Sequence, residues 1–333
     1  PSMRGPVVAI MGPTASGKSS LALALAERLG GEIVSADSAQ VYRGLDVGTA
    51  KPSAADRERV PHHLLDLRDP DQGFSLAEFL SLARPALEDL HTRGRLPLLV
   101  GGTGLYLRGL LEGYTLVEVP PDPNLRRTLE ARETPSLLAD LQARDPETAG
   151  KIDPRNRRRL IRALEVCMQT GRAFSEVSRR VPPDNPRLKL GLRVPREVLA
   201  ERIDRRLEAM VAGGWVEEVS RLAEKGWGPC LRHLRILGYC EILDVVEGNR
   251  PLQEALEEIR LATRRYARRQ ETWLRAEPGL EWIDFQPALL RAAEERIRRF
   301  LEEAQLEAAC RDRKESGGAP SGGPPERRNP PCS

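Results

Sequence analysis

Aromatic residues are scarce in this 333-residue chain, and their scarcity limits how a core can be built. Phenylalanine, tryptophan and tyrosine make up 4% of the sequence, whereas hydrophobic residues of all kinds make up 40% and charged residues 30%. Apolar burial must therefore rest on leucine, valine, isoleucine and alanine. This balance is typical of a globular protein and argues against a disordered one. The length suffices for one large domain or two medium ones.

Long apolar runs and leader-like segments are also missing. No apolar stretch approaches the roughly 20 residues that a membrane-spanning helix needs. An apolar strand begins almost directly after Pro1-Ser2-Met3-Arg4, which leaves no room for a signal or transit peptide. We therefore expect a cytoplasmic protein that makes no membrane contact.

Cysteines are few and far apart. The five are Cys167, Cys230, Cys240, Cys310 and Cys332. None forms a Cys-x-x-Cys pair, so the sequence indicates neither a zinc site nor a disulfide framework. The formal net charge of +3 is too small to indicate a nucleic-acid partner, but the charge is unevenly spread: between Lys151 and Arg193 there are 12 Lys/Arg against 4 Asp/Glu.

The first hundred residues alternate between strand and helix patterns. The apolar run 6–11 is typical of a buried parallel strand, and Ser19–Leu29 of a helix closed by glycines. A second strand is expected at 33–35, a helix at 75–92 with Ser75 as its N-cap, and a third strand at 96–100. This alternation predicts an α/β fold, with a parallel sheet covered by helices on both faces.

The pattern changes near residue 115. Residues 116–185 are charged, helical and interrupted by prolines, which predicts an inserted all-helical subdomain. Residues 188–194 then resemble a strand that returns the chain to the main domain, and helices are expected at 196–212, 214–225, 239–247, 251–275 and 287–309. We therefore expect a catalytic core formed by 1–115 and 186–310, and a disordered tail over 311–333 that is rich in Gly, Pro and Ser.

A phosphate-binding loop follows the first strand. Gly12-Pro-Thr-Ala-Ser-Gly-Lys-Ser19 fits G-x-x-x-x-G-K-[ST] at every fixed position and opens a helix. Its backbone N–H groups and the helix N-terminus would face phosphate oxygens. Lys18 would neutralise a terminal phosphate, and Ser19 would hold Mg²⁺.

The position of the nearest acidic residue helps to decide whether such a loop belongs to an NTPase or to another kind of enzyme. NTPases usually carry such a residue at the end of a neighbouring strand, but the strand 96–100 runs into Gly101-Gly102-Thr103 instead. Asp37, after the second strand, is the acid placed near the loop. Its spacing fits a chemical role and a turn cap equally well.

Several segments together resemble the tRNA dimethylallyltransferase family (tRNA isopentenyltransferases), and their order and spacing hold from about residue 6 to 275. The segments are Gly12-Pro-Thr-Ala-Ser-Gly-Lys-Ser19, Ser35-Ala-Asp-Ser-Ala-Gln-Val-Tyr42, Gly48-Thr-Ala-Lys-Pro52, Pro61-His-His-Leu64, Gly101-Gly-Thr-Gly-Leu-Tyr106, Arg159-Leu-Ile-Arg-Ala-Leu-Glu165, Leu237-Gly-Tyr-Cys-Glu241 and Thr263-Arg-Arg-Tyr-Ala-Arg-Arg-Gln-Glu-Thr-Trp273. The resemblance implies a P-loop NTPase-like core. It also implies transfer of a dimethylallyl group from its diphosphate to the N6 amine of the adenosine 3′ of the anticodon, in tRNAs reading codons that begin with U. The implied partners are dimethylallyl diphosphate and a tRNA anticodon stem-loop, bound by a monomer.

The resemblance also implies roles for individual residues. Asp37 corresponds to the general base, Thr14 and Thr103 lie near the reacting groups, and Arg235 reaches the diphosphate. The diphosphate would be held by Gly12, Pro13, Thr14, Ala15, Ser16, Gly17, Lys18 and Ser19. The tRNA would be contacted by Asp37, Ser38, Ala39, Gln40, Thr103, Arg126, Arg158, Arg159, Leu160, Ile161 and Arg162.

Three other functions share parts of this pattern. An adenylate isopentenyltransferase acts on free nucleotide and would need no inserted tRNA-binding subdomain, so the basic block at 151–193 argues against it. A P-loop small-molecule kinase should carry a lid arginine pattern. A non-catalytic tRNA-binding protein would not need the loop, Asp37 and Thr103 together.

Overall fold

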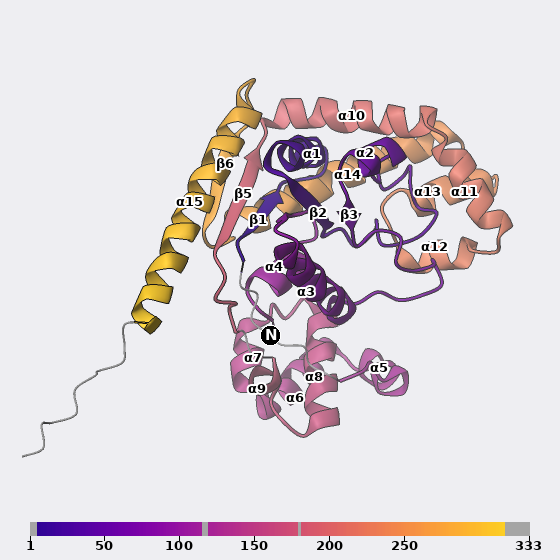
Figure 1. Cartoon of the computed structure of the whole chain (residues 1–333). Coiled ribbons are helices and arrows are strands. Elements are labelled where there is room, and N and C mark those ends of the chain that lie inside the picture. The colour runs from indigo at the N-terminus through magenta and orange to yellow at the C-terminus, as the bar shows by residue number, and fades with distance from the viewer. Residues whose placement is uncertain (1–4, 115–118, 179–180, 317–333) are drawn as a thin grey trace, which may run out of the picture.

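Six strands, all parallel, form one sheet in the order β3-β2-β4-β1-β5-β6 within the described residues (Figure 1). The computed structural model describes residues 5–114, 119–178 and 181–316. The strands are β1 (Val7–Met11), β2 (Gly31–Ser35), β3 (His62–His63), β4 (Leu96–Gly101), β5 (Arg187–Arg193) and β6 (Leu280–Asp284). The predicted α/β fold class is thereby confirmed.

The central strand β1 supplies both faces of the sheet. Because side chains alternate along a strand, Val7, Ala9 and Met11 enter one apolar cluster while Val8 and Ile10 enter the other. Helices α3 (Leu76–Thr92) and α4 (Gly104–Leu111) cover the first face, and α1 (Lys18–Leu29) and α15 (Leu289–Ser316) cover the second. The core is thus aliphatic, as the composition requires.

The start of α3 follows the predicted capping pattern. Ser75 Oγ accepts a hydrogen bond from the N–H of Glu78, and the Glu78 carboxylate accepts one from the N–H of Ser75. This reciprocal pair satisfies two N–H groups that a helix start otherwise leaves free. The predicted N-cap is confirmed.

A second group of helices packs beside one end of the sheet. It comprises α10 (Arg196–Ala212), α11 (Trp215–Glu224), α12 (Gly228–Leu234), α13 (Tyr239–Val246) and α14 (Leu252–Arg275), with α2 (Ala54–Arg59) near the sheet edge. Helices α11 to α14 share an apolar cluster with Val41, Tyr42 and Leu45, which follow β2. This cluster brings the chain after β2 against helices more than 150 residues away.

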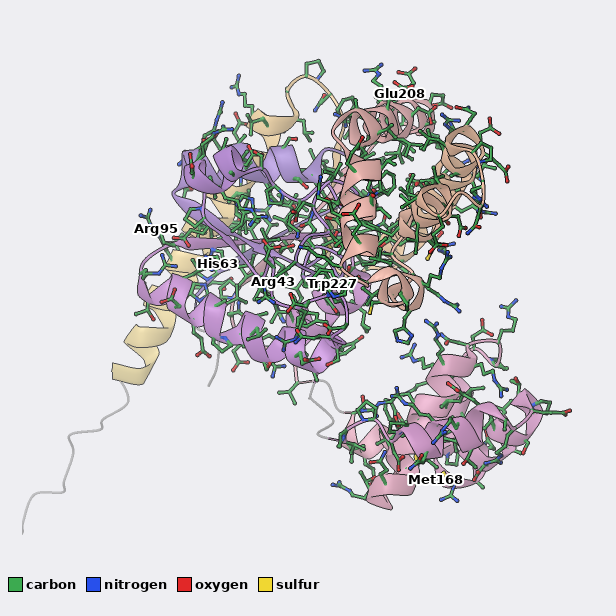
Figure 2. All side chains as sticks on the ribbon, turned by 90° about the vertical axis from the view of Figure 1, so that its right-hand side faces the viewer. Arg43, His63, Arg95, Met168, Glu208 and Trp227 are labelled. Carbon is green, nitrogen blue, oxygen red and sulfur yellow. The ribbon has the colours of Figure 1, made fainter. Side chains whose placement is uncertain are left out.

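The segment between α4 and β5 forms a helical bundle with a core of its own. Its helices are α5 (Pro123–Glu130), α6 (Thr134–Arg144), α7 (Pro146–Lys151), α8 (Arg157–Thr170) and α9 (Phe174–Val177). Figure 2 shows this bundle lying beside the α/β body, with Met168 at its far side. None of the helices in the described part of the chain combines the length and hydropathy of a membrane span.

Several elements differ from the sequence prediction. β3, β6, α2, α4 and α12 were not predicted, because each is short or lies beside glycine and proline. Helix α15 continues to Ser316, so the expectation of disorder from residue 311 is wrong for 311–316. These residues include Arg, Lys and Glu, which favour a helix. The rest of the expected tail, 317–333, lies outside the described residues.

Candidate active site

The phosphate loop has the backbone form that its glycines predict. Ala15 and Gly17 adopt left-handed conformations with φ of 62° and 92°. A Cβ at Gly12 would lie 2.6 Å from Ser16 Oγ, so a side chain there would displace the Ser16 hydroxyl. Lys18 Nζ donates to the carbonyl of Pro13 at 3.2 Å, which holds the ammonium over the loop. The Ser16 hydroxyl is buried and, within the described residues, has no hydrogen-bond partner.

Two distant side chains fix this loop. Gln270 of α14 accepts a hydrogen bond from the N–H of Thr14 and donates another to the carbonyl of Gly102, which follows β4. Arg202 of α10 donates to the carbonyl of Ser16 at 2.9 Å, and its guanidinium lies 4.6 Å from the centre of the Phe285 ring. Neither residue belongs to a motif that the sequence analysis assigned to the loop.

Asp37 follows β2 and uses its two carboxylate oxygens differently. Oδ1 accepts a hydrogen bond from the N–H of Ala39 at 2.9 Å, which is the turn-capping role. No hydrogen bond in the described part of the chain engages Oδ2. The two readings of Asp37 left open by its spacing are therefore compatible, since one oxygen caps the turn while the other is available.

Thr103 joins this segment to the end of β4. Its Oγ1 accepts a hydrogen bond from the N–H of Ser38 at 3.1 Å and lies 3.3 Å from Ser38 Oγ. Gln40 extends the same segment toward residues 49 and 50, whose carbonyls accept from its amide. Asp37, Ser38, Gln40 and Thr103 therefore form one connected group beside the loop.

Two cavities meet at Asp37. One, of about 530 Å³, is largely apolar, with walls that include Leu207, Met210 and Ile259. The other, of about 490 Å³, is lined by Lys18 and Ser19 of the phosphate loop. The residues that line both are Thr14, Asp37, Thr49, Arg206 and Tyr266. A ligand with phosphate and hydrocarbon parts could therefore occupy both spaces across this junction.

Arg206 is the main site residue that sequence reasoning missed. It projects from α10 into the junction, where burial lowers its pKa and the charge of Asp37 raises it. Burial also lowers the pKa of Lys18 to about 8, helped by Arg206 and opposed by Asp37. The signal that could have found Arg206 is its spacing of four residues from Arg202, which places two arginines on one face of a predicted helix.

Tyr266 closes the junction from α14. Burial, followed by the negative charge of Asp37, raises the pKa of its phenol to about 12. The hydroxyl therefore stays protonated at neutral pH. Arg269 lies 5.7 Å from the centre of the Tyr266 ring, at the rim of the apolar cavity.

Arg235 is the residue that was expected to reach the diphosphate. It ends α12 in a left-handed conformation with φ of 51° and lines the apolar cavity. The cavity beside the phosphate loop is lined by Arg206 instead. The contact of Arg235 with the diphosphate stays a prediction, and Arg206 is a second arginine, lining both cavities, that could make such a contact.

The basic residues of the helical bundle divide into two groups. Arg126 and Arg162 both bond to the buried carboxylate of Glu165, at 2.8 Å and 2.6 Å. Although burial alone would raise the pKa of Glu165, these arginines lower it. Arg158 and Arg159 are exposed, and neither guanidinium group forms an ion pair or hydrogen bond within the described residues.

The remaining predicted tRNA contacts on α8 face inward. Leu160 is fully buried and Ile161 is 7% exposed, and both belong to the core of the bundle. Their side chains are therefore not offered to a ligand in this structure. On α14, Arg264 bonds to Asp204, whereas Arg265 and Arg268 are exposed.

Comparisons with known proteins agree with one another. The family model described as IPP transferase matches residues 40–277. A tRNA dimethylallyltransferase of Thermomicrobium roseum is 47% identical over 320 residues, covering 95% of this chain and 97% of that protein. One of Chloroflexus aurantiacus is 48% identical over 288 residues, covering 85% and 97%.

The solved structures that resemble this chain are transferases of the same kind. The full-length tRNA isopentenylpyrophosphate transferase of Bacillus halodurans matches with a TM-score of 0.69 and 39% identity, covering 92% of this chain and 100% of that one. A eukaryotic dimethylallyltransferase, described in crystallographic snapshots acting on tRNA, matches with a TM-score of 0.74 and 28% identity, covering 84% and 74%.

Proposed function

The chain belongs to the tRNA dimethylallyltransferase (IPP transferase) family, and we propose that it transfers a dimethylallyl group from dimethylallyl diphosphate to the N6 amine of the adenosine 3′ of the anticodon (position 37). The acceptors are tRNAs that read codons beginning with U, and diphosphate is released. The observation that carries this proposal is the junction of the two cavities, where Asp37 and Arg206 face a space shared by the phosphate loop and the apolar walls.

The chemistry follows from the residues at this junction. The N6 nitrogen forms a bond to C1 of the dimethylallyl group, while the C1–oxygen bond breaks and its electron pair leaves with the diphosphate. The proton lost by N6 passes to the carboxylate of Asp37, whose Oδ2 is available. A positioned carboxylate of this kind contributes as a general base.

Charge neutralisation is the larger task, because negative charge develops on the leaving diphosphate. Lys18, Arg206 and the N–H groups at the start of α1 supply fixed positive charge and dipoles there. Thr14, which lines both cavities, lies beside the reacting centre. The phosphate loop thus binds a leaving group and transfers no phosphoryl group.

Mg²⁺ fits this site through Ser19. The ion usually takes one or two protein oxygens together with phosphate oxygens and water, and the exposed Ser19 hydroxyl opens into the phosphate-loop cavity. When bound, the ion would neutralise part of the charge on the diphosphate.

The anticodon stem-loop would be held by the helical bundle and the α/β body together. Arg158 and Arg159 are exposed cations suited to backbone phosphates. The target adenine would leave its stack and enter the cavity next to Asp37. For an enzyme that acts on tRNA, we expect a cytoplasmic location and a monomer.

The experiment that tests this function compares three acceptors. The chain is incubated with radiolabelled dimethylallyl diphosphate and either unmodified tRNA, adenosine monophosphate or water, and in parallel with labelled ATP. Label on tRNA alone supports the proposal. Label on adenosine monophosphate would instead favour the adenylate isopentenyltransferase function, and tRNA-stimulated ATP hydrolysis would favour an ATPase or kinase.

A further inference from the structure

The loop at residues 45–51, here called the cavity loop, forms part of the wall where the two cavities meet. Gly48 and Thr49 line the apolar cavity, and Thr49, Ala50 and Lys51 line the cavity of the phosphate loop. The loop joins β2 to α2 and contains no regular strand or helix. Hydrogen bonds within the loop, such as those from the N–H of Ala50 to the carbonyl of Val47 and from the N–H of Lys51 to the carbonyl of Asp46, shape its turn. Contacts with other parts of the chain then place it against the cavities.

Glu218 on α11 holds this loop through its backbone. The carboxylate, whose residue is only 4% exposed, accepts hydrogen bonds from the N–H groups of Asp46 at 2.9 Å, Val47 at 2.7 Å and Gly48 at 3.3 Å. It accepts a fourth from the hydroxyl of Tyr239 at 2.7 Å. These four donors match the roughly four lone-pair positions of a carboxylate.

The charge of Glu218 is compensated by these donors. No lysine, arginine or histidine of the described ranges forms an ion pair with it. Three successive N–H groups converging on an anion form a nest, which is a stable arrangement for a buried negative charge. The carboxylate therefore selects the one loop conformation in which residues 46–48 point their N–H groups at α11.

Packing around Gly48 favours the same loop conformation. A Cβ at Gly48 would lie 2.1 Å from Nε1 of Trp215, the first residue of α11. The loop backbone thus lies directly against the indole ring, and any side chain at position 48 would push it away. Contacts with Trp215 and Glu218 therefore hold one side of the loop against α11.

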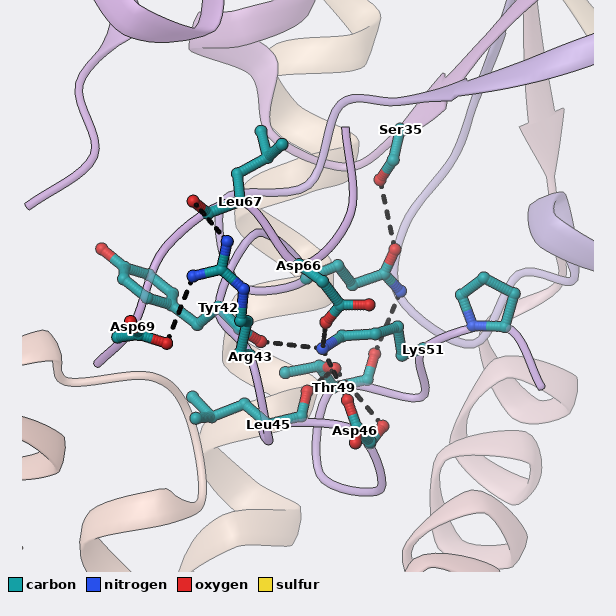
Figure 3. A network of polar contacts seen from close by, with 12 residues as sticks. Ser35, Tyr42, Arg43, Leu45, Asp46, Thr49, Lys51, Asp66, Leu67 and Asp69 are labelled. Atoms are coloured by element: carbon teal, nitrogen blue, oxygen red, sulfur yellow. Dashed lines mark hydrogen bonds and ion pairs between the residues drawn. The ribbon is translucent and has the colours of Figure 1, made fainter. Parts of the chain in front are cut away.

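On its other side the cavity loop is connected to the Asp37 segment, and Figure 3 shows the neighbouring bonds of Lys51 to Asp46 and Asp66. The amide nitrogen of Gln40 donates to the carbonyls of Thr49 and Ala50 at 3.3 Å and 3.2 Å, while its oxygen lies 3.2 Å from Ser35 Oγ. Lys51 Nζ bonds to Asp46 and Asp66, each at 2.6 Å. A shift of the loop would therefore move Gln40 and the turn that carries Asp37.

We propose that Glu218 is a positioning residue for dimethylallyl transfer. By fixing residues 46–48, it keeps Thr49, Gln40 and Asp37 at the positions relative to the phosphate loop that transfer requires. This inference rests on the proposed function. Glu218 touches no reacting atom, and its effect reaches the site through the cavity loop. Because misplacing a reacting group by about 1 Å can cost roughly 100-fold in rate, a loosened loop should slow transfer without weakening diphosphate binding.

The test compares Glu218→Gln with Glu217→Gln, an exposed neighbour on the same helix. An amide offers one acceptor oxygen and brings N–H donors toward a nest of donors, so it cannot replace the carboxylate. Binding sites are counted by titration with dimethylallyl diphosphate, and single-turnover transfer to saturating tRNA is measured per site. We expect Glu218→Gln to lower the rate about 10- to 100-fold with unchanged diphosphate affinity, and Glu217→Gln to behave as wild type.

A wild-type rate per site in Glu218→Gln would overturn the proposal, as would a loss of activity that only follows a loss of binding sites. If Glu218→Gln does not fold, Glu218→Asp decides, since it keeps a carboxylate but its shorter side chain draws the oxygens away from the three backbone N–H groups. Slower transfer at unchanged diphosphate affinity in this variant supports the positioning role, and wild-type transfer overturns it. A wild-type chain that modifies no tRNA would overturn the proposed function itself, which is a separate and recognisable result.

Discussion

The side-chain oxygen of Gln270 accepts a hydrogen bond from the N–H of Thr14 at 2.7 Å, which joins the long helix α14 directly to the phosphate loop. The same amide donates to the carbonyl of Gly102 at 3.0 Å, so the loop and the end of β4 share one anchor. Gln270 itself is only 3% exposed, and its bond to Gly102 is buried.

The first prediction follows from this anchor. Gln270→Ala leaves the buried carbonyl of Gly102 and the partly buried N–H of Thr14 without this partner, which should lower the free energy of unfolding by about 1–3 kcal/mol. Affinity for dimethylallyl diphosphate should fall as well, because the loop loses a fixed position. Urea unfolding and calorimetric titration measure both. Gln253→Ala, an exposed position on the same helix, is the control, and equal results for the two variants would contradict the anchor.

The second prediction separates the two roles of Asp37. Asp37→Asn keeps an oxygen that can accept from the N–H of Ala39, so the turn should survive while the base is lost. Single-turnover transfer should fall by about 10²–10⁴-fold with tRNA affinity retained. A transfer rate equal to that of wild type would remove Asp37 from the role of base.

The third prediction concerns pH. The pKa of Lys18 is lowered from 10.5 to about 8 in the free site by burial and by Arg206. Bound diphosphate favours the charged form and raises this pKa, so the contribution of Lys18 to the affinity should be constant below pH 8. Above pH 8 the free site loses the proton that binding requires, and affinity should fall by up to about tenfold per pH unit. Lys18→Met should bind more weakly and lack this decline. A wild-type affinity that does not change between pH 7 and 9.5 would contradict the lowered pKa.

The fourth prediction distinguishes the arginines of the helical bundle. Arg158→Ala with Arg159→Ala should weaken tRNA binding and reduce the slope of log affinity against log salt by about 0.7–0.9 for each lost phosphate contact. Thermal stability should not change, because neither residue is paired within the described residues.

Arg162→Ala should behave differently. It removes one of two cationic partners from the buried Glu165 carboxylate, so the bundle should lose stability as well as any tRNA contact. If the Arg158/Arg159 double variant retains both the wild-type affinity for tRNA and the wild-type salt slope, the fourth prediction is wrong. The main phosphate contacts would then be expected at Arg265 and Arg268 on α14.

Local patterns made much of the fold predictable. The apolar run at β1, the glycines of the phosphate loop and the Ser75 capping pair each determine structure within a few residues, so sequence spacing was enough to find them. Strand β3 was not predictable in the same way. It has two residues, and only its pairing with β2 defines it.

The site residues that sequence reasoning missed are those whose role depends on distant partners. Arg206 lines the phosphate-loop cavity and Gln270 bonds to the loop, from helices roughly 190 and 250 residues further along the chain. Arg206 shares a helix face with Arg202, and Gln270 lies within the segment 263–273, but neither local pattern tells that the side chain meets the loop. The basic run at 157–162 predicts a charged helix face but does not tell which members are exposed. That division depends on Glu165, which is buried and holds Arg162 together with Arg126.

The central claim is tested most directly by locating the modification on the RNA. An unmodified tRNA that reads codons beginning with U is incubated with the chain and dimethylallyl diphosphate, cut into oligonucleotides, and analysed by mass spectrometry beside the same tRNA carrying guanosine at position 37. We predict one dimethylallyl group on the anticodon-loop fragment, assigned to N6 of the adenosine 3′ of the anticodon, and none on the guanosine-bearing tRNA. An unmodified fragment, or a dimethylallyl group at another nucleotide, would contradict the account.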